Sequence, residues 1–257
     1  MNDKSQAVAQ ALILARSSRQ PCDALQAHLQ LKDMDEAYAV QSSMGRALKW
    51  WGASGPRFWK TGGAGPHAVQ NSAPLPEEGV WQGPGPHDAT AWPMHSRGVE
   101  SEIALRLRTA VTLDMARDIG VDDARGLLDA MAVAIELVDF RWTQGVQADE
   151  LLKLADLQSH SALVLGEWQP FTHMDWSRQV CRTRIGDQLE IVRQGSHPFG
   201  DPTQVLPGWL RHATARFGTL PAGTVVTTGS WIGLPYAQAG DLVQAGFEGL
   251  GQVCVQL

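Results

Sequence analysis

Apolar residues recur at the spacing of amphipathic helices through most of the first fifty residues of the chain. The stretch Gln6–Ala15 is rich in Ala, Leu and Gln, and the proline that follows ends it because proline cannot continue a helix. A second helix is expected over Asp33–Trp50, where Asp33 and Glu36 have the spacing of a capping pair. We therefore predict that the N-terminal part is helical.

The pattern changes between residues 52 and 93, where glycine and proline cluster. Such a segment cannot continue a helix, so short strands joined by long turns are expected. From Val99 the chain alternates between apolar and polar residues, as a strand does, and Glu100 and Glu102 then point to the same face. A buried strand is expected over residues 134–142, where Glu136 lies inside an apolar run and requires a partner.

The rest of the chain combines helices with several strands. Helices are expected over residues 122–132 and 204–216, where apolar positions follow helical spacing. Strands are expected over residues 162–165, 179–185, 188–193, 224–228 and 253–257. Helices first and mostly strands later predict an α+β fold dominated by sheet, not an alternating βαβ array.

Composition and charge narrow the class of protein. Hydrophobic residues make up 44% of the chain and charged residues 19%, which is typical of a globular protein. The formal net charge of −6 offers no basic surface to nucleic acid or to an anionic membrane. No stretch approaches the roughly 18 apolar residues of a membrane span, and three widely separated cysteines argue against a disulfide framework. We expect a soluble, cytoplasmic protein with no nucleic-acid or membrane partner.

Two carboxylates on one strand face suggest a cation site. Glu100 and Glu102 would lie about 7 Å apart along a strand, and hard cations such as Mg²⁺ prefer oxygen ligands. Glu136 would complete a site of three carboxylates if its strand lay beside theirs. The alternatives are a solvated strand face for the first two, and a buried ion pair of Glu136 with Arg141 or Arg106.

Lys60 lies among aromatic residues just before a glycine-rich turn, in the segment R-F-W-K-T-G. A partly desolvated lysine can hold an anionic substrate, or can transfer a proton if its pKa is lowered. The alternative is a surface lysine whose aliphatic stem packs on the protein.

The order of these features resembles the fumarylacetoacetate hydrolase superfamily, specifically its branch of 2-keto-4-pentenoate hydratases and 4-oxalocrotonate decarboxylases. The motifs that carry the resemblance span nearly the whole chain: F-W-K-T-G at 58–62, V-E-S-E-I-A-L at 99–105, A-I-E-L-V-D-F-R-W at 134–142, A-D-L-Q-S-H-S-A-L-V-L-G at 155–166 and V-V-T-T-G-S-W-I-G-L-P at 225–235. The resemblance implies a mixed β-roll catalytic core over residues 56–257, with a helical part over residues 1–55 packed beside it as one intimate unit.

The resemblance also implies roles for the charged candidates. Glu100, Glu102 and Glu136 match the carboxylates that hold Mg²⁺ or Mn²⁺ in this family, and Lys60 matches its active-site lysine. The T-T-G-S segment matches a turn that lies against a keto acid, which makes its last three residues candidate substrate contacts: Thr228, Gly229 and Ser230. The alternative for this segment is a simple tight turn, for which the glycine would suffice.

One loop departs from the family pattern. Hydratases of this branch often carry an acidic residue between the lysine segment and E-x-E, and no acid aligns there. The candidates for proton transfer in this loop are Glu77, Glu78 and His87. A histidine has an ordinary pKa near 6.5, which suits proton transfer at neutral pH, whereas a glutamate needs desolvation to raise its pKa. A metal-bound water with no side-chain base is the third possibility.

The chemistry implied by the resemblance is that of a metal-chelated enolate of a 2-oxo acid. We expect a divalent-metal-dependent hydratase, a hydro-lyase for 2-hydroxydienoate or 2-oxo-enoate acids of aromatic degradation. The alternatives are decarboxylation of a 2-oxo-diacid, C–C hydrolysis of an acylpyruvate, and a non-catalytic member of the fold that binds a ligand. The expected partner is a small 2-oxo acid, and a homo-oligomer is possible.

Overall fold

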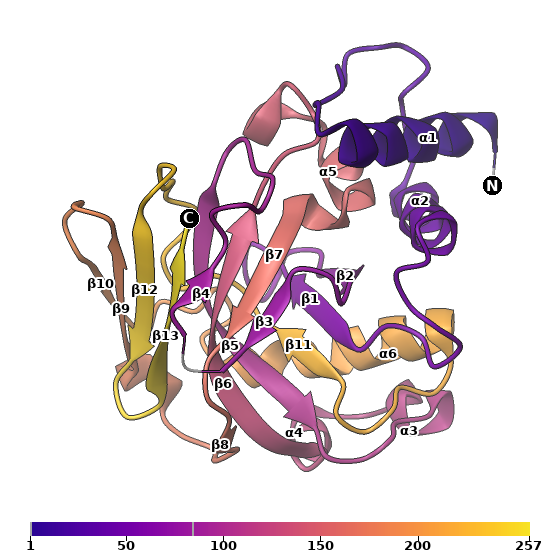
Figure 1. Ribbon diagram of the computed structural model, residues 1–257. Helices are drawn as coiled ribbons and strands as arrows, with labels where there is room; N and C mark the ends of the chain where they lie inside the picture. Colours follow the sequence, from indigo (N-terminus) through magenta and orange to yellow (C-terminus); the bar gives the residue numbers. More distant parts are fainter. Residues whose placement is uncertain (1, 84) are drawn as a thin grey trace.

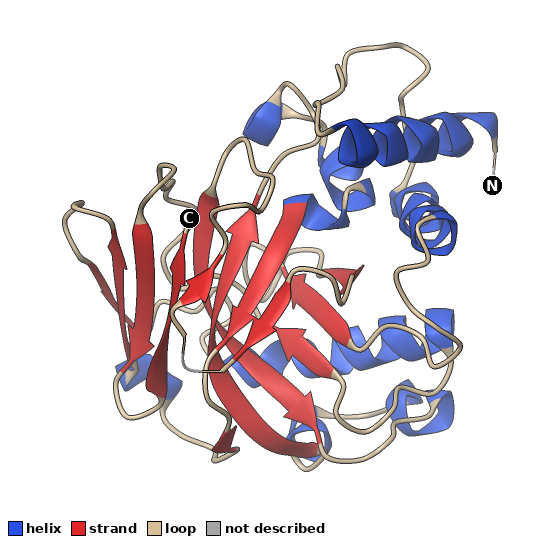
Figure 2. Ribbon diagram, viewed as in Figure 1, coloured by secondary structure: helices blue, strands red, loops and turns tan. Residues whose placement is uncertain are grey.

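The computed structural model describes residues 2–83 and 85–257. Two curved sheets lie side by side, with the N-terminal helices at one end of the molecule and a long helix along one flank (Figures 1 and 2). Among the described residues, no helix combines the length and the apolar character that crossing a bilayer would require. The predicted α+β class is confirmed.

Both predicted N-terminal helices are present, and the first begins three residues before Gln6. Helix α1 covers Asp3–Ser18 and helix α2 covers Met34–Ala47. The Asp33 side chain accepts a hydrogen bond from the Glu36 backbone N–H, so the predicted capping pair starts α2. Both helices pack on helix α5, Glu150–Ala155, through one apolar cluster that includes Leu12, Met44, Trp142 and Leu152. The predicted division of the chain near residue 55 stays a prediction.

The larger sheet has eight strands, in the order β2-β1-β11-β5-β6-β7-β3, with β8 paired to β6. Its two central strands are the longest and pair in antiparallel fashion along most of their length. The bounds are β1 Phe58–Gly62, β2 Asn71–Leu75, β3 Val80–Gln82, β5 Gly98–Leu107, β6 Leu128–Val138, β7 His160–Leu165, β8 Gln169–Pro170 and β11 Val225–Thr227.

The smaller sheet has five strands, in the order β10-β9-β12-β13-β4. The bounds are β4 His87–Asp88, β9 Val180–Ile185, β10 Ile191–Gln194, β12 Leu242–Phe247 and β13 Gly251–Gln256. The main core lies between the sheets, where Ile103 and Val133 of the larger sheet join Val243 and Val253 of the smaller one. Helix α6, Leu206–Phe217, adds Trp209 and Leu210 to the same cluster.

The prediction of one helix over residues 122–132 is wrong. Only Val121–Arg125 is helical, as α4, and another short helix, α3, covers Leu113–Arg117. Gly126 follows α4, and β6 begins at Leu128 because the remaining residues pair with β5 over its full length. Long-range strand pairing therefore outweighs the local helical pattern. Strand β12 was not among the expected strands, because its six residues include a glycine and a glutamine that interrupt the apolar run.

Candidate active site

Strands β5 and β6 bring the three glutamates together. Glu100 and Glu136 are direct partners across the antiparallel pair, and Glu102 lies two residues along β5 on the same face. One carboxylate oxygen from each residue lies within 4.8 Å of the others. The register between β5 and β6, which cannot be read from the sequence, thus brings the three carboxylates together.

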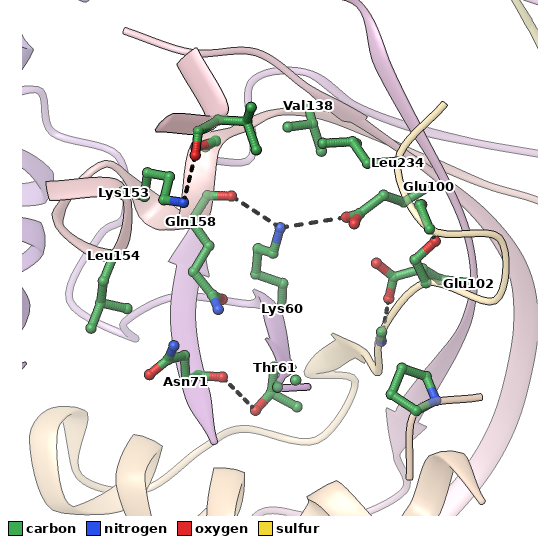
Figure 3. Close-up of a pocket in the computed structure, with 18 of the residues that line it drawn as sticks. Lys60, Thr61, Asn71, Glu100, Glu102, Val138, Lys153, Leu154, Gln158 and Leu234 are labelled. Carbon is green, nitrogen blue, oxygen red and sulfur yellow. Dashed lines mark hydrogen bonds and ion pairs between the residues drawn. The ribbon is translucent and has the colours of Figure 1, made fainter. Parts of the chain in front are cut away.

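Lys60 reaches this cluster from β1, which is separated from β5 by β11. Its Nζ lies 2.6 Å from Glu136 Oε1 and 3.8 Å from Glu100 Oε2. The ammonium also donates to the backbone carbonyl of Gln158 at 3.4 Å, and Figure 3 shows it between that carbonyl and Glu100. Lys60 is therefore a buried residue of the cavity and not a surface lysine.

Burial and mutual charge govern the protonation of the four groups. Burial opposes the charge of Lys60, but Glu136 and Glu100 outweigh that effect and raise its pKa to about 12. Burial raises the pKa of Glu100 to about 7 despite Lys60. Burial, together with the two neighbouring glutamates, raises the pKa of Glu102 well above its usual value. Burial would also raise the pKa of Glu136, yet Lys60 and His160 hold it below the ordinary value. Lys60 is thus a stable ammonium. The alternative from the sequence, a lysine that transfers a proton because its pKa is lowered, is not supported.

The chemistry of the cluster fits a divalent cation. Glu136 Oε2 is buried and has no hydrogen-bond partner among residues 2–83 and 85–257, which is costly for a carboxylate oxygen unless another group occupies it. Burial, with a smaller effect of the neighbouring carboxylates, raises the pKa of Glu100 and Glu102, and a cation would stabilise the charged form that burial disfavours. Carboxylate oxygens are the ligands that Mg²⁺ and Mn²⁺ prefer. The three glutamates could therefore hold such an ion.

Lys60, Glu100 and Glu102 line a cavity of about 380 Å³, and Glu136 lies buried beside them. Its polar lining includes Lys60, Glu100, Glu102, Asn71, Lys153, Gln158 and Ser230, and its apolar lining includes Val138, Phe140, Leu154 and Leu234 (Figure 3). The Lys153 ammonium is held by the Glu150 carboxylate at 2.7 Å and by the Val146 carbonyl at 2.9 Å. The cavity thus has the size of a small-molecule site, and both charged and apolar side chains line it.

The proposed ion pairs of Glu136 with Arg141 or Arg106 are not formed. Arg141 pairs with Asp156 at 2.7 Å, and Arg106 pairs with Asp129 at 2.9 Å. Asp156 also accepts from Arg16 of α1 at 2.8 Å, so one fully buried carboxylate joins α1 to Arg141 in the segment after β6.

His160 is a functional candidate that the sequence analysis did not single out. Its Nδ1 lies 3.0 Å from Glu136 Oε1, and its ring is buried. It follows the segment Leu157–Ser159, in which three consecutive non-glycine residues have positive φ values of 54°, 53° and 62°. Residues in this region are strained, and such strain gathers at functional sites. No local sequence signal marks a run of left-handed residues without glycine or asparagine, although the segment lies within one of the quoted motifs.

The turn after β11 approaches the same carboxylates. The Gly229 backbone N–H donates to Glu102 Oε2 at 2.7 Å, and the glycine has a φ of 117° that L side chains rarely adopt. Gly229 and Ser230 line the cavity. Thr228 is fully buried and donates instead to the Ile103 carbonyl at 2.9 Å, so its hydroxyl supports the turn and does not face the cavity.

The structure does not bring the three loop candidates to the cavity. Glu77 lies in a separate hollow beside Arg106, and Glu78 lines another cleft near Arg16. His87 belongs to β4 of the smaller sheet, where its Nε2 lies 3.1 Å from the Gly83 carbonyl. The physical reason is that β3 joins the edge of one sheet while β4 joins the other sheet, so the loop is drawn away from the carboxylates. Their predicted part in proton transfer therefore gains no support from the geometry.

Comparison with family models matches residues 61–257 to the fumarylacetoacetate (FAA) hydrolase C-terminal family. Comparison with solved structures finds 4-oxalocrotonate decarboxylase from Pseudomonas putida G7, complexed with magnesium and adipate, at a TM-score of 0.82 and 17% identity, covering 100% of this chain and 98% of that chain. A sequence comparison with curated proteins finds no match.

More distant structures share the fold over part of the chain. They include 2-hydroxyhepta-2,4-diene-1,7-dioate isomerase from Mycobacterium marinum, at a TM-score of 0.57 and 15% identity, covering 79% of this chain and 74% of that chain. Fumarylpyruvate hydrolase from Pseudomonas aeruginosa, complexed with Mn²⁺ and pyruvate, matches at a TM-score of 0.56 and 13% identity, covering 79% of this chain and 89% of that chain. At these identities the likeness concerns the fold, and the expected mixed β-roll fold is confirmed.

Proposed function

The chain belongs to the fumarylacetoacetate hydrolase family, and we propose that it is a divalent-metal-dependent lyase that acts on an unsaturated 2-oxo acid. The observation that carries this proposal is that Lys60, Glu100 and Glu102 line one cavity, and that Glu136, buried beside them, completes the cluster of three carboxylates. The names of the three solved structures described above support it, because each names a small dicarboxylate or a 2-oxo acid as the substrate or the bound molecule. A non-catalytic binding protein would have no need for a cation site joined to a buried ammonium.

The three glutamates would hold Mg²⁺ or Mn²⁺. When bound, the cation supplies positive charge beside the carboxylate and keto oxygens of a 2-oxo acid, and so stabilises the enolate that forms from it. Gly229 orients Glu102 by donating to its Oε2, and Ser230 lines the cavity from the same turn. This chain's own contribution is therefore to fix the ligand carboxylates and to present donors around the reacting acid.

Lys60 contributes a second positive charge. Its pKa of about 12 keeps it protonated at neutral pH, so it can donate a hydrogen bond to an anionic oxygen. A buried ammonium is effective because the surrounding dielectric is low. We assign Lys60 to stabilisation of the enolate and not to proton abstraction.

Among the reactions that share an enolate, the geometry best supports decarboxylation of a 2-oxo-diacid. The bond between the distal carboxylate and its carbon breaks, its electron pair enters the conjugated enolate, CO₂ leaves, and a proton then returns to the enolate. This reaction needs no base to activate water, and of the described residues none of the three loop candidates lines the cavity. Apolar wall such as Val138 and Leu234 also favours a carboxylate that becomes neutral.

Hydration of a 2-hydroxydienoate is the second candidate. The sequence motifs resemble the hydratase branch, and one accessible carboxylate, Glu150, lines the cavity with its side chain 88% exposed. Glu150 could activate water for addition to the far carbon. The two reactions therefore differ in their need for this residue.

The test uses metal-stripped protein with and without Mg²⁺. CO₂ release is measured with 2-oxohex-3-enedioate, and loss of dienol absorbance is measured with 2-hydroxypenta-2,4-dienoate. We expect Mg²⁺-dependent CO₂ release that Glu102→Gln abolishes and Glu150→Gln preserves. Hydration without CO₂ release, lost in Glu150→Gln, would establish the second candidate instead. A folded protein that converts neither acid with Mg²⁺ or Mn²⁺ would overturn the proposal.

A further inference from the structure

His160 is a buried histidine whose ring makes one hydrogen bond, to Glu136 Oε1 at 3.0 Å. The other ring nitrogen, Nε2, is buried without a partner among the described residues. An N–H at Nε2 would therefore have no acceptor, whereas an N–H at Nδ1 meets a carboxylate oxygen. The tautomer with the hydrogen on Nδ1 leaves no donor unmatched, so His160 donates and Glu136 accepts.

Glu136 consequently has two different oxygens. Oε1 accepts from both Lys60 and His160, while Oε2 has no hydrogen-bond partner in the part of the chain that the structure describes. Two donors on one oxygen restrict rotation of the carboxylate about its last bond. The free oxygen is then the one that is left for a cation.

The backbone around His160 is built to hold the ring in this place. The strand register between β6 and β7 shifts at Leu137 and Val138, so that His160 lies opposite Val138 while Glu136 lies opposite Leu163. Such irregularities redirect side chains. The His160 carbonyl accepts from the buried Arg141 guanidinium at 2.7 Å, and the left-handed segment Leu157–Ser159 leads directly into the residue.

We propose that His160 is a positioning residue that orients Glu136 for the divalent cation by donating from Nδ1 to Oε1. This inference rests on the proposed function, because it supposes that the three glutamates hold a metal ion. It goes further in assigning the orientation of one ligand to a residue that never touches substrate or metal. Loss of the donor would leave the carboxylate charged and held at Oε1 by Lys60 alone, and would weaken the cation site without removing a ligand.

The test compares three substitutions that differ in the placement of a donor. In His160→Asn the amide nitrogen takes the place of Nδ1 and can still donate to Glu136. In His160→Gln the longer side chain carries its amide to the position of Nε2, and in His160→Leu the donor is absent. His212→Asn is the matched control, because His212 is a half-buried histidine on α6 that packs against Tyr38 and Trp59 and does not line the cavity.

The first readout is the binding of Mn²⁺ to metal-free protein. It is measured from the electron paramagnetic resonance signal of the Mn²⁺ that remains free. We expect the Kd for Mn²⁺ to rise about 10- to 100-fold in His160→Leu and His160→Gln. We expect a change of less than about threefold in His160→Asn and none in His212→Asn. Urea unfolding of each metal-free variant shows whether the fold is retained.

The second readout separates positioning from a general structural defect. If His160 acts through Glu136, saturating Mn²⁺ restores most of the kcat of His160→Leu, because the ligand is still present. Equal Mn²⁺ affinity in wild type and folded His160→Leu would overturn the inference, and so would equal weakening in the Asn and Gln variants. Failure of all three variants to fold would also overturn it, by assigning His160 to the fold. Wild-type protein that binds no Mn²⁺ would instead refute the proposed function itself.

Discussion

Replacing Glu136 by glutamine separates the two roles that its position allows, metal ligand and buried ion-pair partner. The residue is fully buried and accepts from Lys60 Nζ at 2.6 Å and His160 Nδ1 at 3.0 Å. Removing one partner of a buried ion pair costs about 3–5 kcal/mol when the other charge is left alone. Lys60 is not left alone, because Glu100 lies 3.8 Å away and the new amide oxygen can still accept a hydrogen bond.

We therefore expect the free energy of unfolding of metal-free Glu136→Gln to fall by about 1–3 kcal/mol. This is less than the total stability of about 5–15 kcal/mol that is typical of native proteins, so the variant should fold. The affinity for Mn²⁺ should fall more than about 100-fold, beyond the loss seen when a residue that only supports a ligand is changed. Metal-dependent turnover should be lost at ordinary Mg²⁺ concentrations.

Urea unfolding followed by tryptophan fluorescence measures the first quantity, and titration of metal-free protein with Mn²⁺ measures the second. Glu248→Gln is the control, because it removes a glutamate from an exposed pair with Arg182 at 3.2 Å, which is worth about 0–1 kcal/mol. A variant that unfolds, or that loses far more stability than expected while binding Mn²⁺ as tightly as wild type, would show that Glu136 is structural and would refute the reasoning.

Two further predictions concern the charged cluster, and a third concerns the loop that holds Glu77, Glu78 and His87. Lys60→Met should lower kcat about 100-fold or more without weakening Mn²⁺ binding, because an ammonium repels the cation but stabilises the substrate anion; unchanged kcat in steady-state assays would contradict this role. Mn²⁺ affinity should fall at least about tenfold per pH unit below pH 7, because cation binding must then displace the proton of Glu100, whose pKa is about 7, and also that of Glu102, whose pKa is raised well above its usual value; a flat affinity between pH 5.5 and 7 would argue against the assignment. Glu77→Gln, Glu78→Gln and His87→Gln should keep full activity, and loss of turnover in any of them would place this loop in the reaction.

The sequence predicts those parts of the site that depend on local pattern. Glu100 and Glu102 share a face because a strand has a period of two, and Glu136 is conspicuous because its neighbours are apolar. The helices at the N-terminus follow from spacing and from the cap at Asp33. The resemblance to a known family added the roles of these residues, which spacing alone left open.

The remainder depends on contacts between distant segments. The pairing of Glu100 with Glu136 is a strand register, and no local signal fixes it. The sequence analysis placed His87 near the site, but β4 pairs with the last strand of the chain. The partners His87 and Val255 are 168 residues apart in the sequence. His160 could not be found because its ring reaches Glu136 only through an irregular register and a left-handed segment that lacks the residues typical of that conformation.

The buried carboxylate of Asp156 has a consequence for how this protein can be recombined with its relatives. It binds Arg16 of α1 on one side and Arg141 on the other, and Arg141 in turn holds the carbonyl of His160. The family match begins at residue 61, so α1 lies outside the matched region and still supports it. The N-terminal helices are therefore not a freely exchangeable module: a chimera that receives another helical part must bring a hydrogen-bond donor to the position of Arg16, or the buried Asp156 carboxylate keeps Arg141 as its charged partner and loses the link to the helices.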